Sequence, residues 1–177
     1  VETESWPDGQ KRYYRVITPL GEMTRMDMLA SDGTWSRKEF FIKEMRDLKT
    51  MRYMVEHTHF EPEFEKIDAI RQELGDWGQG DIVLSRSPFG KLVHEYMGFE
   101  QVIYTLNDDP EPLFEFMEIQ ERKDLELVAL AARAPERLVI MSDHTDEILI
   151  SPSQWRDYCV PFYRKITDIL HGADKFV

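Results

Sequence analysis

Asp143, His144 and Asp146 are the side chains in this sequence best suited to proton transfer. They directly follow a run of apolar residues, 138–141. A histidine beside carboxylates can be held in one tautomer with a raised pKa, which suits a general acid or base. We therefore predict that Asp143 and His144 are catalytic and that Asp146 binds substrate. The alternative is that the carboxylates cap the following turn and that His144 only packs in the loop.

A second polar segment, Ser85, Arg86 and Ser87, follows the short run 81–84. The guanidinium of Arg86 could bind a substrate carboxylate through its fork of N–H donors, and the serine hydroxyls could donate hydrogen bonds. These three residues are predicted to bind substrate. The alternatives are a salt bridge for Arg86, and serines that serve only as turn residues before Pro88.

The elements around these segments should bring them together. The runs 81–84 and 138–141 are too short for free helices and are typical of buried parallel strands. Helical patterns follow each of them, over 89–97 and from the N-cap Ser151 and Pro152 to about residue 171. Ligands bind at the carboxyl ends of parallel strands, so we expect both polar segments to face one cavity.

The rest of the chain predicts an α/β fold in two parts. An antiparallel β extension is predicted over 1–42, and its first ten residues, 1–10, are expected to be an exposed terminus. Residues 43–177 are predicted to form a partial TIM (β/α)8 barrel, because strands and helices alternate there. The expected strands of the extension are 11–18, 23–29 and 34–42, and the expected further helices are 43–56, 61–74, 99–106 and 111–132, with another strand starting at 175.

Composition narrows the class of protein. The net charge of -12 argues against a nucleic-acid partner, and no apolar run approaches the ~20 residues of a membrane span. The single cysteine excludes an intramolecular disulfide and fits a reducing compartment. The sequence therefore predicts a cytoplasmic protein with no membrane association.

Two further groups contain residue types that bind metals. His57 and His59 have Glu56 and Glu61 nearby, but a solvated loop between two helices is the expected interpretation. Cys159 lies within a predicted helix, with no second sulfur or histidine at ligand spacing, so we expect a buried structural thiol. No metal site is predicted within this chain.

Several short motifs, in this order and spacing, resemble the uroporphyrinogen decarboxylase superfamily over roughly residues 42–177. The superfamily includes porphyrinogen decarboxylases and corrinoid-dependent methyltransferases. The motifs are Phe41-Ile42-Lys43 with Asp47-Leu48-Lys49, then Ser87-Pro88-Phe89, then Leu106-Asn107-Asp108-Asp109-Pro110-Glu111, and finally Asp143-His144 with Ile150-Ser151-Pro152, Trp155 and Pro161.

The resemblance implies a substrate cavity lined by Ser87 and Phe89, with Tyr96 as a candidate pocket tyrosine. It places Asp143 where the decarboxylases hold a serine beside their histidine. The arginine-rich motif that binds carboxylates in the decarboxylases has no match. The antiparallel extension is more similar to the methyltransferase-like members, which use zinc and a corrinoid.

We therefore expect part of a corrinoid-dependent methyltransferase-like enzyme that acts on a small molecule with a corrinoid protein as partner. Zinc and corrinoid would belong to the longer parent enzyme, and this chain alone is expected to be inactive. Two alternatives stay open, a uroporphyrinogen decarboxylase and a non-catalytic fragment that self-associates as a homodimer.

Overall fold

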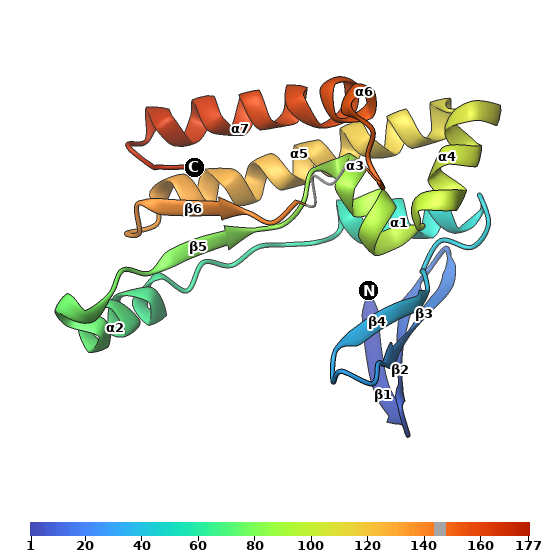
Figure 1. Cartoon of the computed structure of the whole chain (residues 1–177), viewed down its shortest axis with the longest axis horizontal. Coiled ribbons are helices and arrows are strands. Elements are labelled where there is room, and N and C mark those ends of the chain that lie inside the picture. The colour runs from blue at the N-terminus through green and yellow to red at the C-terminus, as the bar shows by residue number, and fades with distance from the viewer. Residues whose placement is uncertain (144–147) are drawn as a thin grey trace. The chain divides into compact units, whose positions relative to one another are not determined.

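The computed structural model describes residues 1–143 and 148–177, which form two compact units (Figure 1). The first unit contains residues 1–58 and 92–120, and the second contains residues 59–91 and 121–177. The long helix α5, Glu111–Arg133, begins in the first unit and ends in the second. Residues 144–147 are outside the described residues, so the predictions for His144 and Asp146 are outside them too.

The first unit is built on a four-stranded antiparallel sheet in the order β1-β2-β3-β4. Its strands are β1 Glu2–Asp8, β2 Lys11–Thr18, β3 Gly21–Leu29 and β4 Trp35–Glu39. The terminus predicted to be exposed is exposed, and it forms the edge strand β1, which was not predicted. It pairs along β2, and Trp6 stacks on Tyr13 directly opposite it, with ring centroids 5.6 Å apart.

Helices complete the core of the first unit. Helix α1, Asp47–Glu56, contacts β2 and β3, and α4 spans Phe99–Asp108 after a π-helical turn, Leu92–Tyr96. Helix α1 begins later than predicted because the Asp47 carboxylate accepts the backbone N–H groups of Lys43 (2.9 Å) and Glu44 (3.0 Å) in the preceding turn. The buried apolar residues include Val16, Met23, Met51, Val102, Leu113 and Phe116.

The second unit contains the two predicted parallel strands with the predicted bounds, but they are not fully buried as predicted, because Val83, Leu138 and Ile140 are exposed. β5, Asp81–Leu84, pairs in parallel with β6, Leu138–Met141. The C-terminal part of α5 and helix α7, Val160–Gly172, lie beside this pair (Figure 1). They bury one face of it, and the shared core consists of Leu84, Val128, Ala131, Val139, Phe162, Ile166 and Leu170.

The strand predicted to start at residue 175 is reduced to a single parallel bridge. The N–H of Phe176 donates to the carbonyl of Arg137, and the N–H of Val139 donates to the carbonyl of Phe176, both at 2.8 Å. The buried Lys175 ammonium donates to the carbonyl of Glu136 at 2.8 Å and to that of Ala134. These bonds satisfy carbonyl groups just after α5, where a helix leaves its last acceptors without intrahelical partners.

The remaining helices of the second unit are short or interrupted. They are α2 Phe64–Leu74, α3 Pro88–Lys91 and α6 Pro152–Gln154, with a 3-10 turn at Gly75–Trp77 and a π-helical turn at Trp155–Cys159. The predicted cap of the last helix is confirmed, since Ser151 and Gln154 form a capping box with Pro152 at the first position. Pro161 cannot donate a backbone hydrogen bond, and its ring crowds the preceding turn, which accounts for the interruption just before α7.

The predicted partial (β/α)8 barrel is wrong. The described residues contain one two-stranded parallel sheet and a separate four-stranded antiparallel sheet, in a mixed α/β arrangement without an eightfold pattern. A barrel requires every strand to pair on both sides, whereas β5 pairs only with β6 among the described residues. Two strand–loop–helix units are enough to predict that their strands pair with each other, but they do not determine whether a sheet closes into a barrel. No helix in the described part of the chain is long and apolar enough to cross a membrane.

Candidate functional site

The polar segments that follow β5 and β6 meet through Ser87 and Asp143. Asp143 Oδ2 accepts hydrogen bonds from the Ser87 backbone N–H (3.1 Å) and from Ser87 Oγ (2.5 Å). The backbone N–H of Ser142 also donates to the carbonyl of Leu84, at 3.3 Å. The expectation that these two strand ends lie together is therefore confirmed for the described residues.

Two residues of the last helical segment complete the cluster. Tyr163 Oη donates to Asp143 Oδ2 at 2.8 Å, and Cys159 Sγ lies 3.5 Å from Ser87 Oγ. Ser87 and Cys159 are fully buried, and Asp143 is half-buried. We call Ser87, Asp143, Cys159 and Tyr163 the strand-end cluster.

Ser87 also determines how α3 begins. Its Oγ accepts the N–H of Gly90 at 3.1 Å, and its carbonyl accepts the N–H of Lys91 at 2.9 Å. Ser87 is thus an N-cap residue, and Pro88 occupies the first helical position, where its missing N–H costs nothing. Ser87 therefore serves as the turn residue before Pro88, which was the alternative interpretation, and it also contacts Asp143.

Burial raises the pKa values of two groups in the cluster, the Cys159 thiol and the Tyr163 hydroxyl. Burial raises the pKa of the Cys159 thiol to about 11, with a further contribution from the Asp143 charge, while the Ser87 hydrogen bond acts in the opposite direction. Burial, followed by the Asp143 charge, also raises the pKa of Tyr163. Both groups are protonated at neutral pH, so Tyr163 is a hydrogen-bond donor to the carboxylate.

The geometry makes Asp143 an anchor for the chain that follows β6. One of its oxygens, Oδ2, accepts three hydrogen bonds, from the backbone N–H and the hydroxyl of Ser87 and from the hydroxyl of Tyr163. The other, Oδ1, is buried and has no hydrogen-bond partner among the described residues. Asp143 therefore joins the residues directly after β6 to the start of α3 and to α7, which is a positioning role.

Alkaline pH should reveal the buried thiol. Unfolded Cys159 has an ordinary pKa of 9.0, whereas the folded thiol keeps its proton until about pH 11. Its contribution to stability is therefore complete below pH 9 and is lost as the pH rises to 11, by about 2–3 kcal/mol. Urea unfolding at several pH values should show that the stability difference between wild type and Cys159→Ala narrows by this amount over that range. A difference that is independent of pH would contradict the assignment.

The other residues predicted to bind substrate lie in different environments. Phe89 is buried and packs against Tyr158, with ring centroids 5.0 Å apart, so it belongs to the core. Ser85 and Arg86 are half-buried between β5 and α3. Tyr96 belongs to the first unit, where its hydroxyl donates to Gln120 Oε1 at 3.3 Å and its ring meets Phe116 edge-on.

A buried ion pair lies in the same unit as the strand-end cluster and was not predicted. Lys91 Nζ, at the end of α3, donates to Asp124 Oδ1 on α5, and both side chains are 7% exposed. Asp124 lies four residues after the buried Gln120 and three before Leu127, so helical spacing places it on the inner side of α5. A charged residue on an inner helical stripe was therefore the available signal for this pair.

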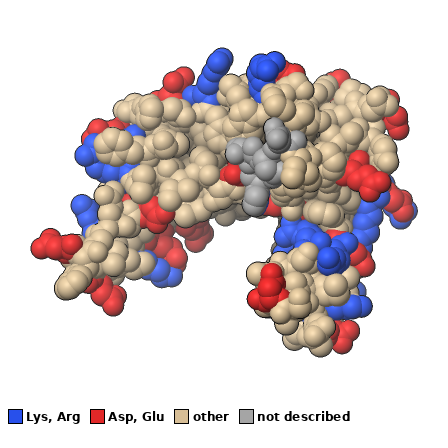
Figure 2. Space-filling view, in the orientation of Figure 1, with Lys and Arg blue, Asp and Glu red and all other residues tan. Residues whose placement is uncertain are grey.

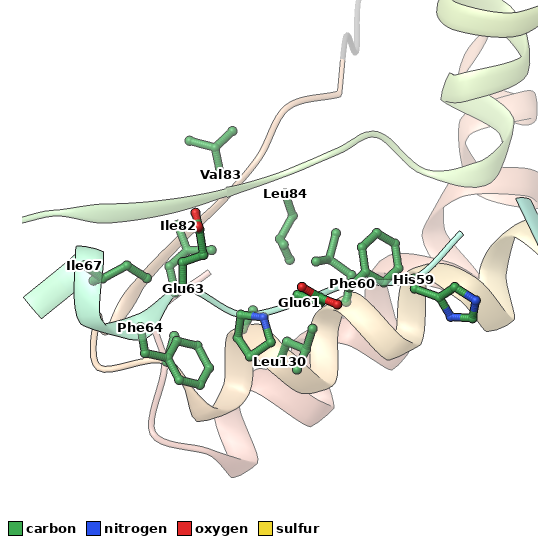
Figure 3. Close-up of a pocket in the computed structure, with 14 residues that line it drawn as sticks. His59, Phe60, Glu61, Glu63, Phe64, Ile67, Ile82, Val83, Leu84 and Leu130 are labelled. Atoms are coloured by element: carbon green, nitrogen blue, oxygen red, sulfur yellow. The ribbon is translucent and has the colours of Figure 1, made fainter. Parts of the chain in front are cut away.

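An apolar pocket of about 320 Å³ lies between β5, α5 and the segment 59–67 (Figure 3). Leu84 points into it, whereas Val83 points away on the other side of β5. Its lining includes Phe60, Phe64, Ile67 and Leu130, with two carboxylates, Glu61 and Glu63, and it includes no member of the strand-end cluster. The pocket is therefore mainly apolar and is separate from the polar residues of the strand-end cluster.

The histidines at 57 and 59 do not form a ligand set. His57 stacks on Tyr53, with ring centroids 3.8 Å apart, and its Nδ1 lies 2.8 Å from the Tyr53 carbonyl. His59 lines the apolar pocket. Among the described residues, no three His, Cys, Asp or Glu side chains lie together as metal ligands.

Comparison with known proteins identified no relative of this chain. Scans against protein-family models, curated proteins and solved structures returned no match to the chain. Functional inference therefore depends on the geometry of the strand-end cluster and on the sequence motifs.

Proposed function

We propose that this chain functions in an enzyme related to the uroporphyrinogen decarboxylase superfamily, and specifically in a corrinoid-dependent methyltransferase-like protein. The observation that carries the proposal is the junction of Ser87 and Asp143 at the carboxyl ends of two paired parallel strands. Ligand sites in α/β proteins are found at such strand ends. The order and spacing of the motifs around these two residues support the same family.

The carboxylate of Asp143 favours methyl transfer over porphyrinogen decarboxylation. In the resemblance, this residue takes the place of a serine, so it adds a negative charge where the decarboxylases receive a substrate rich in carboxylates. Like charges in a half-buried site repel each other and disfavour binding. A substrate without clustered carboxylates suits this position better.

The roles within the proposed enzyme follow from the contacts. Asp143 positions the chain after β6, and His144, the next residue, is proposed for proton transfer on the basis of the sequence. Ser85 and Arg86 are proposed to contact the small-molecule substrate. Zinc and a corrinoid are proposed for the longer parent enzyme, as the resemblance implies.

A binding titration tests the proposal. Methylcobalamin should quench the tryptophan fluorescence of the chain in a saturable manner, and Asp143→Asn should weaken this binding at least about tenfold. The physical reason is that a neutral amide is a weaker acceptor than a carboxylate for the hydrogen bonds from Ser87 and Tyr163. Uroporphyrinogen, titrated in parallel, should bind more weakly than methylcobalamin.

Asp157→Asn is the matched control, because Asp157 is exposed in the same unit. It should leave methylcobalamin affinity unchanged within about twofold. Circular dichroism melting curves establish that both variants are folded. Tighter binding of uroporphyrinogen, or no binding of methylcobalamin, would contradict the proposal.

A further inference from the structure

Three arginines gather around one buried carboxylate on a face of the antiparallel sheet in the first unit. Arg12 on β2 and Arg37 on β4 are the cross-strand partners of Asp27 on β3, and Arg25 lies two residues before it. Arg25 Nη2 and Arg37 Nε each lie 3.5 Å from an Asp27 oxygen. Asp27 is 8% exposed, so this concentration of charge belongs to a partly desolvated site.

Aromatic rings hold two of these guanidinium groups in place. Arg12 lies over the ring of Trp35 at 4.1 Å from the centroid, and Arg25 lies over the ring of Tyr14 at 4.0 Å. Stacking orients the plane of a guanidinium and leaves the N–H groups on its edge available. Arg25 Nε is buried and has no hydrogen-bond partner among the described residues.

Arg37, unlike Arg12 and Arg25, donates hydrogen bonds to another element of the first unit. Its Nη1 donates to the carbonyls of His94 (2.8 Å) and Glu95 (3.0 Å) in the π-helical turn. Burial, and then the charge of Arg25, lower the pKa of Arg37, while the charges of Asp27 and Glu95 raise it. Arg37 therefore connects the sheet to this turn and leaves Arg12 and Arg25 as the groups that can receive a ligand.

The group of arginines around Asp27 has a net positive charge, although the chain as a whole is acidic. Three guanidinium groups face two carboxylates, Asp27 and Glu95, in a protein of net charge -12. Figure 2 shows Lys and Arg side chains gathered on the lobe formed by the antiparallel sheet. Hydrogen bonding by Arg12 is the largest cause of a lowered pKa at Tyr14, as expected where positive charge is in excess.

We propose that Arg12 and Arg25 form a binding site for the anionic group, a carboxylate or a phosphate, of a small molecule. The planar fork of each guanidinium matches two oxygens of either group, and charge-assisted bonds of this kind are stronger than neutral ones. Asp27 holds Arg25 from behind, and the aromatic rings keep both forks oriented. The site is independent of the strand-end cluster and of the function proposed above.

Calorimetric titration with inorganic phosphate and with succinate tests the site. At least one should bind saturably, and Arg12→Gln and Arg25→Gln should each weaken this binding at least about tenfold. Arg15→Gln is the matched control, because Arg15 lies on the opposite face of β2 and pairs with Glu4 and Glu22. It should change affinity by less than about twofold, since exposed ion pairs contribute little.

A second measurement needs no arginine variant. Bound anion offsets the positive charge beside Tyr14, so the Tyr14 pKa, followed by tyrosinate absorbance and assigned with Tyr14→Phe, should rise when the ligand is present. Binding of phosphate alone or of succinate alone supports the site and identifies its ligand class. The proposal is overturned if neither ligand binds saturably, if the three arginine variants weaken binding equally, or if the Tyr14 pKa does not move.

Discussion

Replacing Lys91 with methionine is expected to destabilise the protein by about 3–5 kcal/mol, because it removes the buried ammonium group that pairs with the carboxylate of Asp124. Both side chains are 7% exposed, so water cannot replace the lost partner. Asp124 lies beside apolar residues of the second unit, including Val128 and Phe162. Urea unfolding followed by circular dichroism measures the change.

Two variants separate a buried ion pair from a general effect of losing a lysine. Lys165→Met removes a cation that pairs with Glu121 but is 54% exposed, and it should cost less than about 1 kcal/mol. The double variant Lys91→Met with Asp124→Leu removes both charges and should be more stable than Lys91→Met alone. If Lys91→Met cost no more than Lys165→Met, the pair would not be buried in solution as it is in the structure.

Gly90→Ala is expected to cost about 2–4 kcal/mol, although alanine is normally the better helix former. A Cβ atom on residue 90 would overlap Asp143 Oδ1 and lie 2.8 Å from Oδ2 and 2.9 Å from Cγ. The carboxylate cannot move aside cheaply, because Oδ2 is held by Ser87 and Tyr163. Displacing it would leave buried donors unpaired, at about 1–3 kcal/mol each.

A double-mutant cycle identifies the cause of this cost. In an Asp143→Ala background the obstructing atoms are absent, so Gly90→Ala should cost at least about 1 kcal/mol less than in the wild type. Gly172→Ala is the control, because no atom lies within 4 Å of its added Cβ. An unchanged cost in the Asp143→Ala background would show that Gly90 is needed for a reason other than its approach to Asp143.

Local patterns in the sequence were sufficient to predict the two parallel strands and the helix cap. The runs at 81–84 and 138–141 became β5 and β6 with the predicted bounds, and Ser151 caps its helix as predicted. Burying a short apolar run requires its backbone groups to be paired, and pairing with a neighbouring strand is the available solution. The meeting of Ser87 and Asp143 follows from the parallel register of these strands.

The same patterns were insufficient where residues far apart in sequence decide the outcome. Phe64, Ile67 and Ile70 recur at helical spacing, a pattern typical of an inward face, yet α2 has no buried residue. The helical spacing of Tyr163 does not indicate that its hydroxyl donates to Asp143, twenty positions earlier in the chain. Periodicity identifies an amphipathic face, but it does not identify the surface that covers that face.

Taken by itself, the sequence determined the parallel strand pair, the polar segments that follow it and the cap at Ser151, because each depends on neighbours within a few residues. Only the tertiary structure decided that the sheet stops short of a barrel, that Asp143 is held by Ser87 and Tyr163, and that Arg25 and Arg37 share the Asp27 carboxylate. The physical reason is that closure, hydrogen-bond saturation and charge clustering depend on distances through space. Those distances are set when the strands and helices pack together.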